Sequence, residues 1–208
     1  KQILLSPTRR MYNAMPDTTS EGEQRAYNPE FKHTTYYKIY NDLINNKKLI
    51  DTAKRTGYKI KYVLHPILSS QVNDFIPDPY VEVVSSVGDF NYETAFQESS
   101  LMVTDYSGVQ FDFAYMKKPL VYFHPSQLPA HYDDGGFFYD TMGFGEICTE
   151  RDQLVALLCE YMETGCKMKP KYVERVEDFY QFDDHNNCER IYNEIIKYQQ
   201  QVNKDKLK

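Results

Sequence analysis

The sequence lacks several features that would assign it to a common functional class. It has no run of 18 or more apolar residues, which excludes a membrane-spanning helix from these residues. The first residues form too short an apolar run for a signal peptide. Positive charge is not in excess, since 24 Lys and Arg against 30 Asp and Glu give a net charge of −6. A general nucleic-acid-binding protein normally has a basic face, so we expect no nucleic-acid partner.

Known phosphate-binding and metal-binding fingerprints are missing as well. The sequence has no P-loop and no G-x-G-x-x-G motif, and Gly143-Phe-Gly145 alone is too weak a signal. The four cysteines have no C-x-x-C spacing and indicate neither a zinc site nor a disulfide framework. Asp133 and Asp134 are adjacent, but neighbouring side chains on an extended chain diverge, and no further ligands have metal spacing. We therefore expect no bound metal and no cofactor.

The sequence does contain an alternation of apolar strands and amphipathic helices, and its 208 residues suit one domain with a proper core. Strands are predicted at residues 3–8, 58–64, 81–84, 101–103 and 119–123. Helices are predicted at residues 36–56, 93–97, 109–116, 152–162, 173–182 and 187–198, and the polar residues 11–31 predict a loop. This alternation is typical of a parallel sheet flanked by helices. We expect a Rossmann-like α/β domain over residues 1–198, followed by a polar C-terminal tail over residues 199–208.

The most informative stretch is residues 101–125, in which an apolar strand is followed by the polar turn Thr104-Asp-Tyr-Ser-Gly108 and then by a helix. In a parallel sheet, such a turn lies at the carboxyl end of its strand, where open α/β folds bind ligands. The start of the helix offers backbone N–H groups to a phosphate, and Thr104 and Ser107 would add hydroxyl donors. The alternative is that Ser107 only caps the helix and the turn binds no ligand.

Residues 104–115, which read T-D-Y-S-G-V-Q-F-D-F-A-Y, and the K-P-L that follows at residues 118–120 closely resemble a family signature. It is the signature of the CDP-glycerol glycerophosphotransferase family, which includes the teichoic acid polymerases and primases of bacterial cell walls. Gly108 stands where a second serine is usual in that family. Residues 7–10, P-T-R-R, fit the P-T-x-R motif of the family, with Arg9 where an aromatic residue is more usual. The resemblance spans nearly the whole chain, from residue 7 to about residue 196.

The resemblance implies a role within a larger enzyme. It implies that this chain is the C-terminal, donor-binding half of a GT-B type transferase, and that an N-terminal acceptor domain is missing from these residues. The implied reaction transfers glycerol phosphate, or a related polyol phosphate, from a CDP-linked donor such as CDP-glycerol to a hydroxyl of a polymer or lipid-linked acceptor. Such a transfer releases CMP and builds a teichoic-acid-like or capsular polymer. The implied location is the cytoplasm, with peripheral association at the inner face of the cell membrane.

One residue, His65, is predicted to be catalytic. It follows an apolar strand, and Pro66 directs its backbone away from the helical region, which places an imidazole at a strand's carboxyl end. Members of the resembling family have a histidine-proline pair at this position, so the resemblance implies that His65 acts on the donor phosphates. The alternative is a solvent-exposed or core histidine with no role in a site.

Seven further residues are predicted to bind the donor or its phosphates: Arg10, Thr104, Asp105, Ser107, Gly108, Glu146 and Arg190. A carboxylate beside a diphosphate would repel it, so Asp105 is expected to hold the turn, or to orient His65 or a ribose hydroxyl; the alternative is that it caps its own helix. Glu146 is a candidate for ribose hydroxyls, or it caps the following segment. Arg190 is a candidate for a phosphate, or it pairs with a neighbouring acid.

Two alternative functions stay open. The chain is a nucleotide-binding module that is inactive alone, or it is a domain of another GT-B enzyme, such as a nucleotide-sugar glycosyltransferase or epimerase. The second alternative is less favoured, because those enzymes seldom combine T-D-Y-S with F-D-F-A.

Overall fold

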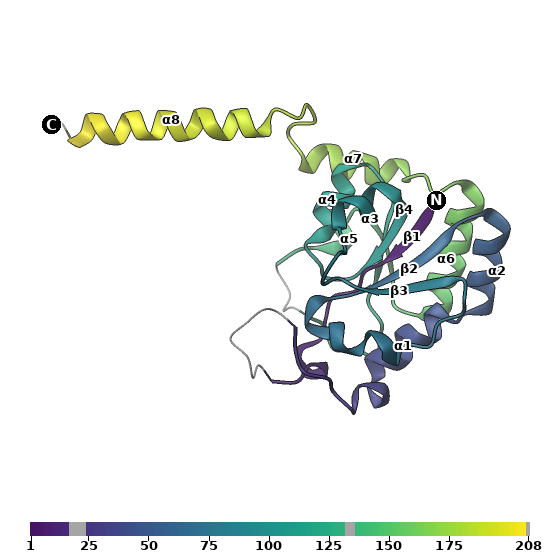
Figure 1. Cartoon of the computed structure of the whole chain (residues 1–208). Helices are drawn as coiled ribbons and strands as arrows, with labels where there is room; N and C mark the ends of the chain where they lie inside the picture. Colours follow the sequence, from purple (N-terminus) through teal and green to yellow (C-terminus); the bar gives the residue numbers. More distant parts are fainter. Residues whose placement is uncertain (17–23, 132–135, 207–208) are drawn as a thin grey trace. The chain divides into compact units, whose positions relative to one another are not determined.

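The computed structural model describes residues 1–16, 24–131 and 136–206 (Figure 1). Contacts among these residues group the chain into two compact units, Lys1–Val176 and Glu177–Lys208. The first unit contains all the strands and the hydrophobic core. The predicted domain boundary at residue 198 stays a prediction.

The first unit is built on one sheet. Within the described residues it has six parallel strands in the order β3-β2-β1-β4-β5-β6 (Figure 1). The strands are β1 (Gln2–Leu5), β2 (Lys59–Leu64), β3 (Val81–Ser85), β4 (Ser99–Thr104), β5 (Leu120–Phe123) and β6 (Gly145–Cys148). The central strands β1, β4 and β5 read as nearly continuous apolar runs because both faces of the sheet are covered. The predicted α/β class, a parallel sheet flanked by helices, is confirmed.

One face of the sheet carries the larger part of the core. The helices that cover it are α1 (Thr35–Ile44), α2 (Lys47–Thr56) and α6 (Arg151–Thr164). Figure 1 shows α2 and α6 side by side on this face, and these two helices make the most extensive helix–helix contact of the unit. Their apolar side chains pack on alternate strand residues, such as Ile3, Tyr62 and Val121, which point to the same face.

The opposite face is covered mainly by two short helices. These two helices are α3 (Tyr92–Glu98) and α4 (Val109–Tyr115). The chain also contains the helices α5 (Tyr139–Met142) and α7 (Pro170–Phe179). Phe96 of α3 and Phe113 of α4 are both buried and pack edge to face, with ring centroids 5.6 Å apart. The crossover from β3 through α3 therefore brings the chain to the other side of the sheet before β4 begins.

The structure corrects several predicted boundaries. The helix predicted over residues 36–56 is two helices, because the first ends at its C-cap Asn45 and Asn46 caps the second by accepting a 3.1 Å hydrogen bond from the Leu49 N–H. The predicted loop over residues 11–31 contains the short 3-10 helix η1 (Met11–Asn13), and η2 (Phe31–His33) begins at its end; residues 17–23 lie outside the described part. Strand β6, helix α5 and the 3-10 helix η3 (Pro66–Asp74) were not predicted either.

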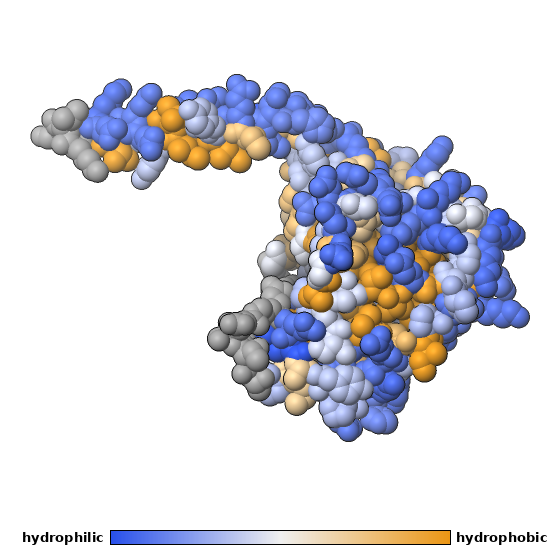
Figure 2. Space-filling view, in the orientation of Figure 1, coloured by the Kyte–Doolittle hydropathy of each residue, from blue (hydrophilic) through white to orange (hydrophobic). Residues whose placement is uncertain are grey.

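The second unit consists mainly of helix α8 (Asn187–Lys206). The sequence predicted that this helix ends at residue 198, but it continues through Lys206, so residues 199–206 of the predicted tail are helical. Ile191, Ile195 and Val202 fall on one side of α8 by their spacing, and Figure 2 shows apolar side chains along this helix.

Candidate functional site

The strand order places one reversal point in the sheet, between β1 and β4. From β1 the chain continues to β2 on one side, whereas from β4 it continues to β5 on the other, and both β2 and β5 run parallel to their neighbours. The connections leave the carboxyl ends of β1 and β4 toward opposite faces, which opens a crevice at this edge. Residues 6–10 and 105–108, which the sequence selected, are the segments that follow these two strands.

A buried ion pair joins these two segments. Arg10 Nη1 lies 3.0 Å from Asp105 Oδ2, and the two side chains are only 2% and 0% exposed. The backbone N–H groups of Thr8 and Tyr106 each donate a 2.7 Å hydrogen bond to Asp105 Oδ1. Burial lowers the pKa of Arg10, but the attraction and hydrogen bond of Asp105 together with the nearby Tyr40 and Tyr36 outweigh it, so the pKa of Arg10 is raised. Asp105 therefore holds the turn, as one of the sequence interpretations proposed.

Buried tyrosines lie behind this ion pair. The side chains of Tyr36 and Tyr40 interact electrostatically with both Arg10 and Asp105. The rings of Tyr40 and Tyr62 are stacked, with centroids 5.7 Å apart. Burial raises the pKa of Tyr40 and that of Tyr62 well above the usual value, so both phenols stay neutral at physiological pH. The ion pair is therefore surrounded by neutral groups that screen its charges less than water does.

The hydroxyl of Thr104 is engaged within the protein. The side chain is buried, and its Oγ1 donates a 2.9 Å hydrogen bond to the carbonyl oxygen of Ser6. This bond ties β4 to the end of β1, so Thr104 supports the turn from below. The prediction that its hydroxyl donates to a phosphate is not supported by this geometry.

Ser107 and Gly108 lie at the accessible side of the turn. Ser107 is half-buried, and its Oγ is 3.5 Å from the Val109 N–H, which is too long for an effective helix cap. Gly108 is exposed and has φ −63° and ψ −21°, which any residue adopts. A Cβ added at Gly108 would meet no atom within 4 Å. The turn therefore does not require glycine there, and the serine that the family usually has would fit.

His65 lies at the carboxyl end of β2, next to β1, as predicted. Its backbone is extended, with φ −57° and ψ 146°, which agrees with the restriction that Pro66 imposes. Its Nδ1 faces the Ile67 N–H at 3.3 Å, and its Nε2 is 3.2 Å from Arg9 Nη1. A neutral imidazole has only one nitrogen that accepts a hydrogen bond, so only one of these contacts is a hydrogen bond at a time. Arg9 thereby brings a guanidinium directly to the predicted catalytic residue.

A second histidine at this edge was missed. His124 follows β5, and its ring is stacked on Tyr106 of the turn, with centroids 4.3 Å apart and an interplanar angle of 4°. Its Nε2 is 3.3 Å from the carbonyl oxygen of Asp105. The sequence contained a usable signal, because His124-Pro125 after an apolar strand repeats the pattern of His65-Pro66.

Two predicted donor-binding residues have partners in their own parts of the chain. Glu146 lies on the edge strand β6, where its carboxylate accepts from the Tyr161 hydroxyl and pairs with Lys169 at 2.8 Å. Arg190 belongs to the second unit, where it pairs with Asp184 and bonds to Asn187 Oδ1 at 3.0 Å. Both side chains thus contact other residues of the protein. For Arg190 this is the alternative that the sequence left open, and the roles of both residues in donor binding stay predictions.

The described residues contain no group of three or more side chains arranged to hold a metal ion. Asp133 and Asp134 lie outside the described residues. In the part of the chain that the structure covers, no helix has the length and apolar character needed to cross a bilayer.

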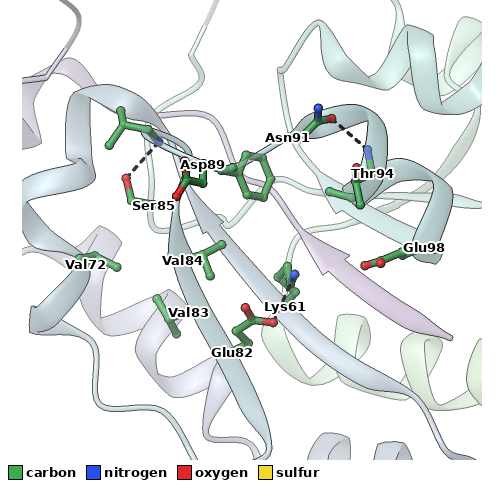
Figure 3. Close-up of a pocket in the computed structure, with 13 residues that line it drawn as sticks. Lys61, Val72, Glu82, Val83, Val84, Ser85, Asp89, Asn91, Thr94 and Glu98 are labelled. Carbon is green, nitrogen blue, oxygen red and sulfur yellow. Dashed lines mark hydrogen bonds and ion pairs between the residues drawn. The ribbon is translucent and has the colours of Figure 1, made fainter.

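A separate hollow of about 540 Å³ lies beside β2, β3 and α3 (Figure 3). Its lining includes the carboxylates of Glu82, Asp89 and Glu98, and Lys61, which pairs with Glu82 at 3.2 Å. None of the predicted site residues lines this hollow. Its acidic lining does not suit the phosphates of a nucleotide.

The fold and the edge described above define a Rossmann-like α/β domain whose polar and histidine-bearing turns meet at the sheet's reversal point. The sequence model of the family described as "CDP-Glycerol:Poly(glycerophosphate) glycerophosphotransferase" matches residues 1–197. The chain belongs to this family.

Known proteins that resemble the chain come from teichoic acid synthesis. It is 39% identical to the minor teichoic acid biosynthesis protein GgaB of Bacillus subtilis (strain 168), over 94% of this chain and 21% of GgaB. It is 26% identical to the teichoic acid poly(ribitol-phosphate) polymerase of Bacillus spizizenii, over 94% of this chain and 28% of that protein. The solved structure of the wall teichoic acid polymerase TagF matches with a TM-score of 0.58 and 20% identity, over 96% of this chain and 44% of TagF. The chain thus spans less than a third of the length of the curated relatives it matches.

Proposed function

We propose that this chain binds a CDP-activated polyol phosphate, CDP-glycerol or a related donor, and presents it for transfer to an acceptor hydroxyl in the synthesis of a teichoic-acid-like or capsular polymer. One observation carries the proposal. The family motif at residues 104–108 forms a turn that is clamped to the end of β1 by a buried ion pair, at the edge where His65 also lies. Family membership supports the reaction class.

The chemistry asked of the site is mainly positioning and charge stabilisation. In phosphoryl transfer the charge is spread over phosphate oxygens, so fixed donors contribute more than covalent catalysis. In this proposal Ser107 and the backbone N–H groups that follow it contact the diphosphate, while Arg9 and His65 face it from the neighbouring strands. His65 stabilises the developing charge or the leaving CMP. Arg10, Thr104 and Asp105 hold the turn in place without contacting the donor. That Arg10 binds a phosphate directly stays a prediction.

The acceptor is proposed to bind outside the region matched here. In a GT-B arrangement a second Rossmann-like domain would supply that site, and the acceptor would be a polymer or a lipid-linked saccharide. A peripheral position at the cytoplasmic face of the cell membrane would suit such an acceptor. The length of the curated relatives, of which this chain matches 21% and 28%, is consistent with further domains in such enzymes.

Calorimetry of the chain with CDP-glycerol, CDP-ribitol, CMP and a UDP-sugar tests the proposal. We expect one of the two CDP-polyols to bind more tightly than CMP. We expect no binding of the UDP-sugar. Preferential binding of the UDP-sugar would favour a nucleotide-sugar enzyme instead. Binding of none of these ligands would contradict a donor site in this chain. If an enzyme that joins this chain to the acceptor domain binds the donor but releases no CMP with acceptor present, the result would favour a nucleotide-binding module without a role in transfer.

A further inference from the structure

His124 is fixed at the edge of the candidate site by its own strand and by the neighbouring one. It follows the last residue of β5, and its backbone N–H donates a 2.8 Å hydrogen bond to the carbonyl oxygen of Cys148 at the end of β6. Its ring is half-buried and lies edge-on to Tyr139, with centroids 4.9 Å apart. The imidazole is therefore held in one place rather than exposed on a loop.

The contact with Asp105 determines which nitrogen of His124 carries the proton. A carbonyl oxygen only accepts hydrogen bonds, so a bond over the 3.3 Å between Nε2 and the Asp105 carbonyl requires a hydrogen on Nε2. Burial lowers the pKa of His124, and the charge of Arg10 acts in the same direction. At neutral pH the side chain is therefore a neutral imidazole whose proton points at the backbone of the turn.

Arg10 also contacts the ring of Tyr106. The guanidinium carbon of Arg10 lies 5.4 Å from the Tyr106 ring centroid, within the range of a cation–π contact. Asp105 is thus fixed through its carboxylate by residues that follow β1, and through its carbonyl by the residue that follows β5. The peptide between Asp105 and Tyr106, which determines where Ser107 lies, is fixed from both sides.

We propose that His124 is a positioning residue for the turn at residues 105–108, which it orients through the Nε2–H···O=C bond to Asp105 and the stack on Tyr106. The role in donor binding rests on the proposed function, because it assumes that this turn contacts the donor's diphosphate. The effect of His124 on the turn itself does not depend on the proposed function. Without the bond, the Asp105 carbonyl loses a partner, and the peptide that precedes Ser107 gains freedom to rotate.

Three variants separate the two contacts of His124. H124F keeps an aromatic ring for the stack and loses the donor, H124Q keeps a donor and loses the ring, and H124A loses both. H33F is the matched control, because His33 is an exposed histidine on η2. If H124F does not fold, the comparison of H124A with H124Q isolates the same hydrogen bond, since both lack the ring.

Hydrogen exchange tests the positioning of the turn without any ligand. The reporters are the amides of Tyr106, Gln110 and Phe111, which donate to Asp105 Oδ1, Ser107 O and Gly108 O. Loss of one neutral hydrogen bond should speed their exchange about two- to tenfold in H124F, while amides of β2 stay unchanged. We expect exchange in H124Q to lie closer to wild type, and H33F to equal wild type. Equal exchange in H124F and wild type would overturn the proposal.

Calorimetry with CDP-glycerol tests the role in donor binding. We expect the dissociation constant to rise about two- to tenfold in H124F, with less change in H124Q, while both variants stay folded at the temperature of the titration. If the wild-type chain binds no donor, the proposed function fails, and hydrogen exchange still decides whether His124 positions the turn. If H124F loosens the turn but binds CDP-glycerol as tightly as wild type, the role of His124 in donor binding is wrong.

Discussion

Replacement of Asp105 by Asn tests whether the buried ion pair holds the site together. The substitution keeps the size of the side chain but removes its charge. Arg10, which is 2% exposed, would then be buried beside neutral tyrosines with no counter-ion in contact. In addition, an amide nitrogen placed where Asp105 Oδ2 now lies would face the guanidinium of Arg10 donor to donor.

The structure gives a magnitude for this change. Removal of one partner from a buried pair costs about 3–5 kcal/mol, most of it because the other charge stays buried and unpaired. In a chain of this size each kcal/mol lowers the melting temperature by about 2–4 °C, so we expect a fall of about 6–20 °C. The assay is urea unfolding of the chain, followed by circular dichroism, with thermal melts as a second measurement.

A matched control uses an exposed ion pair of the same type. Arg55 and Glu163 pair on the surface, with side chains 61% and 48% exposed, and Glu163→Gln should cost less than about 1 kcal/mol. Adding Arg10→Met to Asp105→Asn should restore much of the stability that Asp105→Asn removes, because it leaves no buried charge while the amide oxygen still accepts from Thr8 and Tyr106. A cost for Asp105→Asn as small as that of Glu163→Gln would refute the reasoning.

Four further outcomes are expected. Ser107→Asp places a carboxylate where the diphosphate is proposed to lie, so calorimetry should find no binding of CDP-glycerol; unchanged affinity would mean that the phosphate site is elsewhere. Gly108→Ser should leave the melting temperature within about 2 °C of wild type, because a Cβ there meets no atom within 4 Å. In an enzyme that also carries the acceptor domain, His65→Ala should lower CMP release about 10- to 100-fold, as expected for one hydrogen bond to a charged group made in the transition state. An equal loss in donor affinity would show that His65 only binds the donor. Treatment with EDTA should leave CDP-glycerol binding unchanged, and loss of binding that magnesium restores would show that a metal is required.

The fold was predictable to the extent that local patterns determine it. Strands buried on both faces leave a continuous apolar run in the sequence, and this run was visible for β1, β4 and β5. Strand β6 was missed because it begins with Gly145, which is a poor strand residue by propensity. The structure shows why glycine lies there, since a Cβ would come within 1.9 Å of the Leu120 carbonyl oxygen. That close approach depends on a neighbouring strand and leaves no local pattern.

The candidate site was predictable as a place but not as a set of contacts. The turn after β4 and the histidine after β2 could be found because polar residues interrupt apolar strands at those points. The bond that commits the Thr104 hydroxyl to Ser6 joins residues 98 positions apart, and the Arg10–Asp105 bond joins residues 95 apart. No local pattern encodes such partners. His124 was missed for a different reason. It precedes a proline and follows an apolar strand just as His65 does, so the same local pattern could have identified it.

The pairing of β1 with β4 also bears on the order in which the protein folds as it is synthesised. β1 leaves the ribosome about a hundred residues before β4, which is one of its two neighbouring strands. Until then β1, which is buried in the folded sheet, has a partner on one edge only, so the nascent chain exposes a surface that favours aggregation or chaperone binding. Closing so long a loop is also slow compared with local helix formation. The crevice between β1 and β4 therefore forms late, as a product of the last long-range step in building the centre of the sheet.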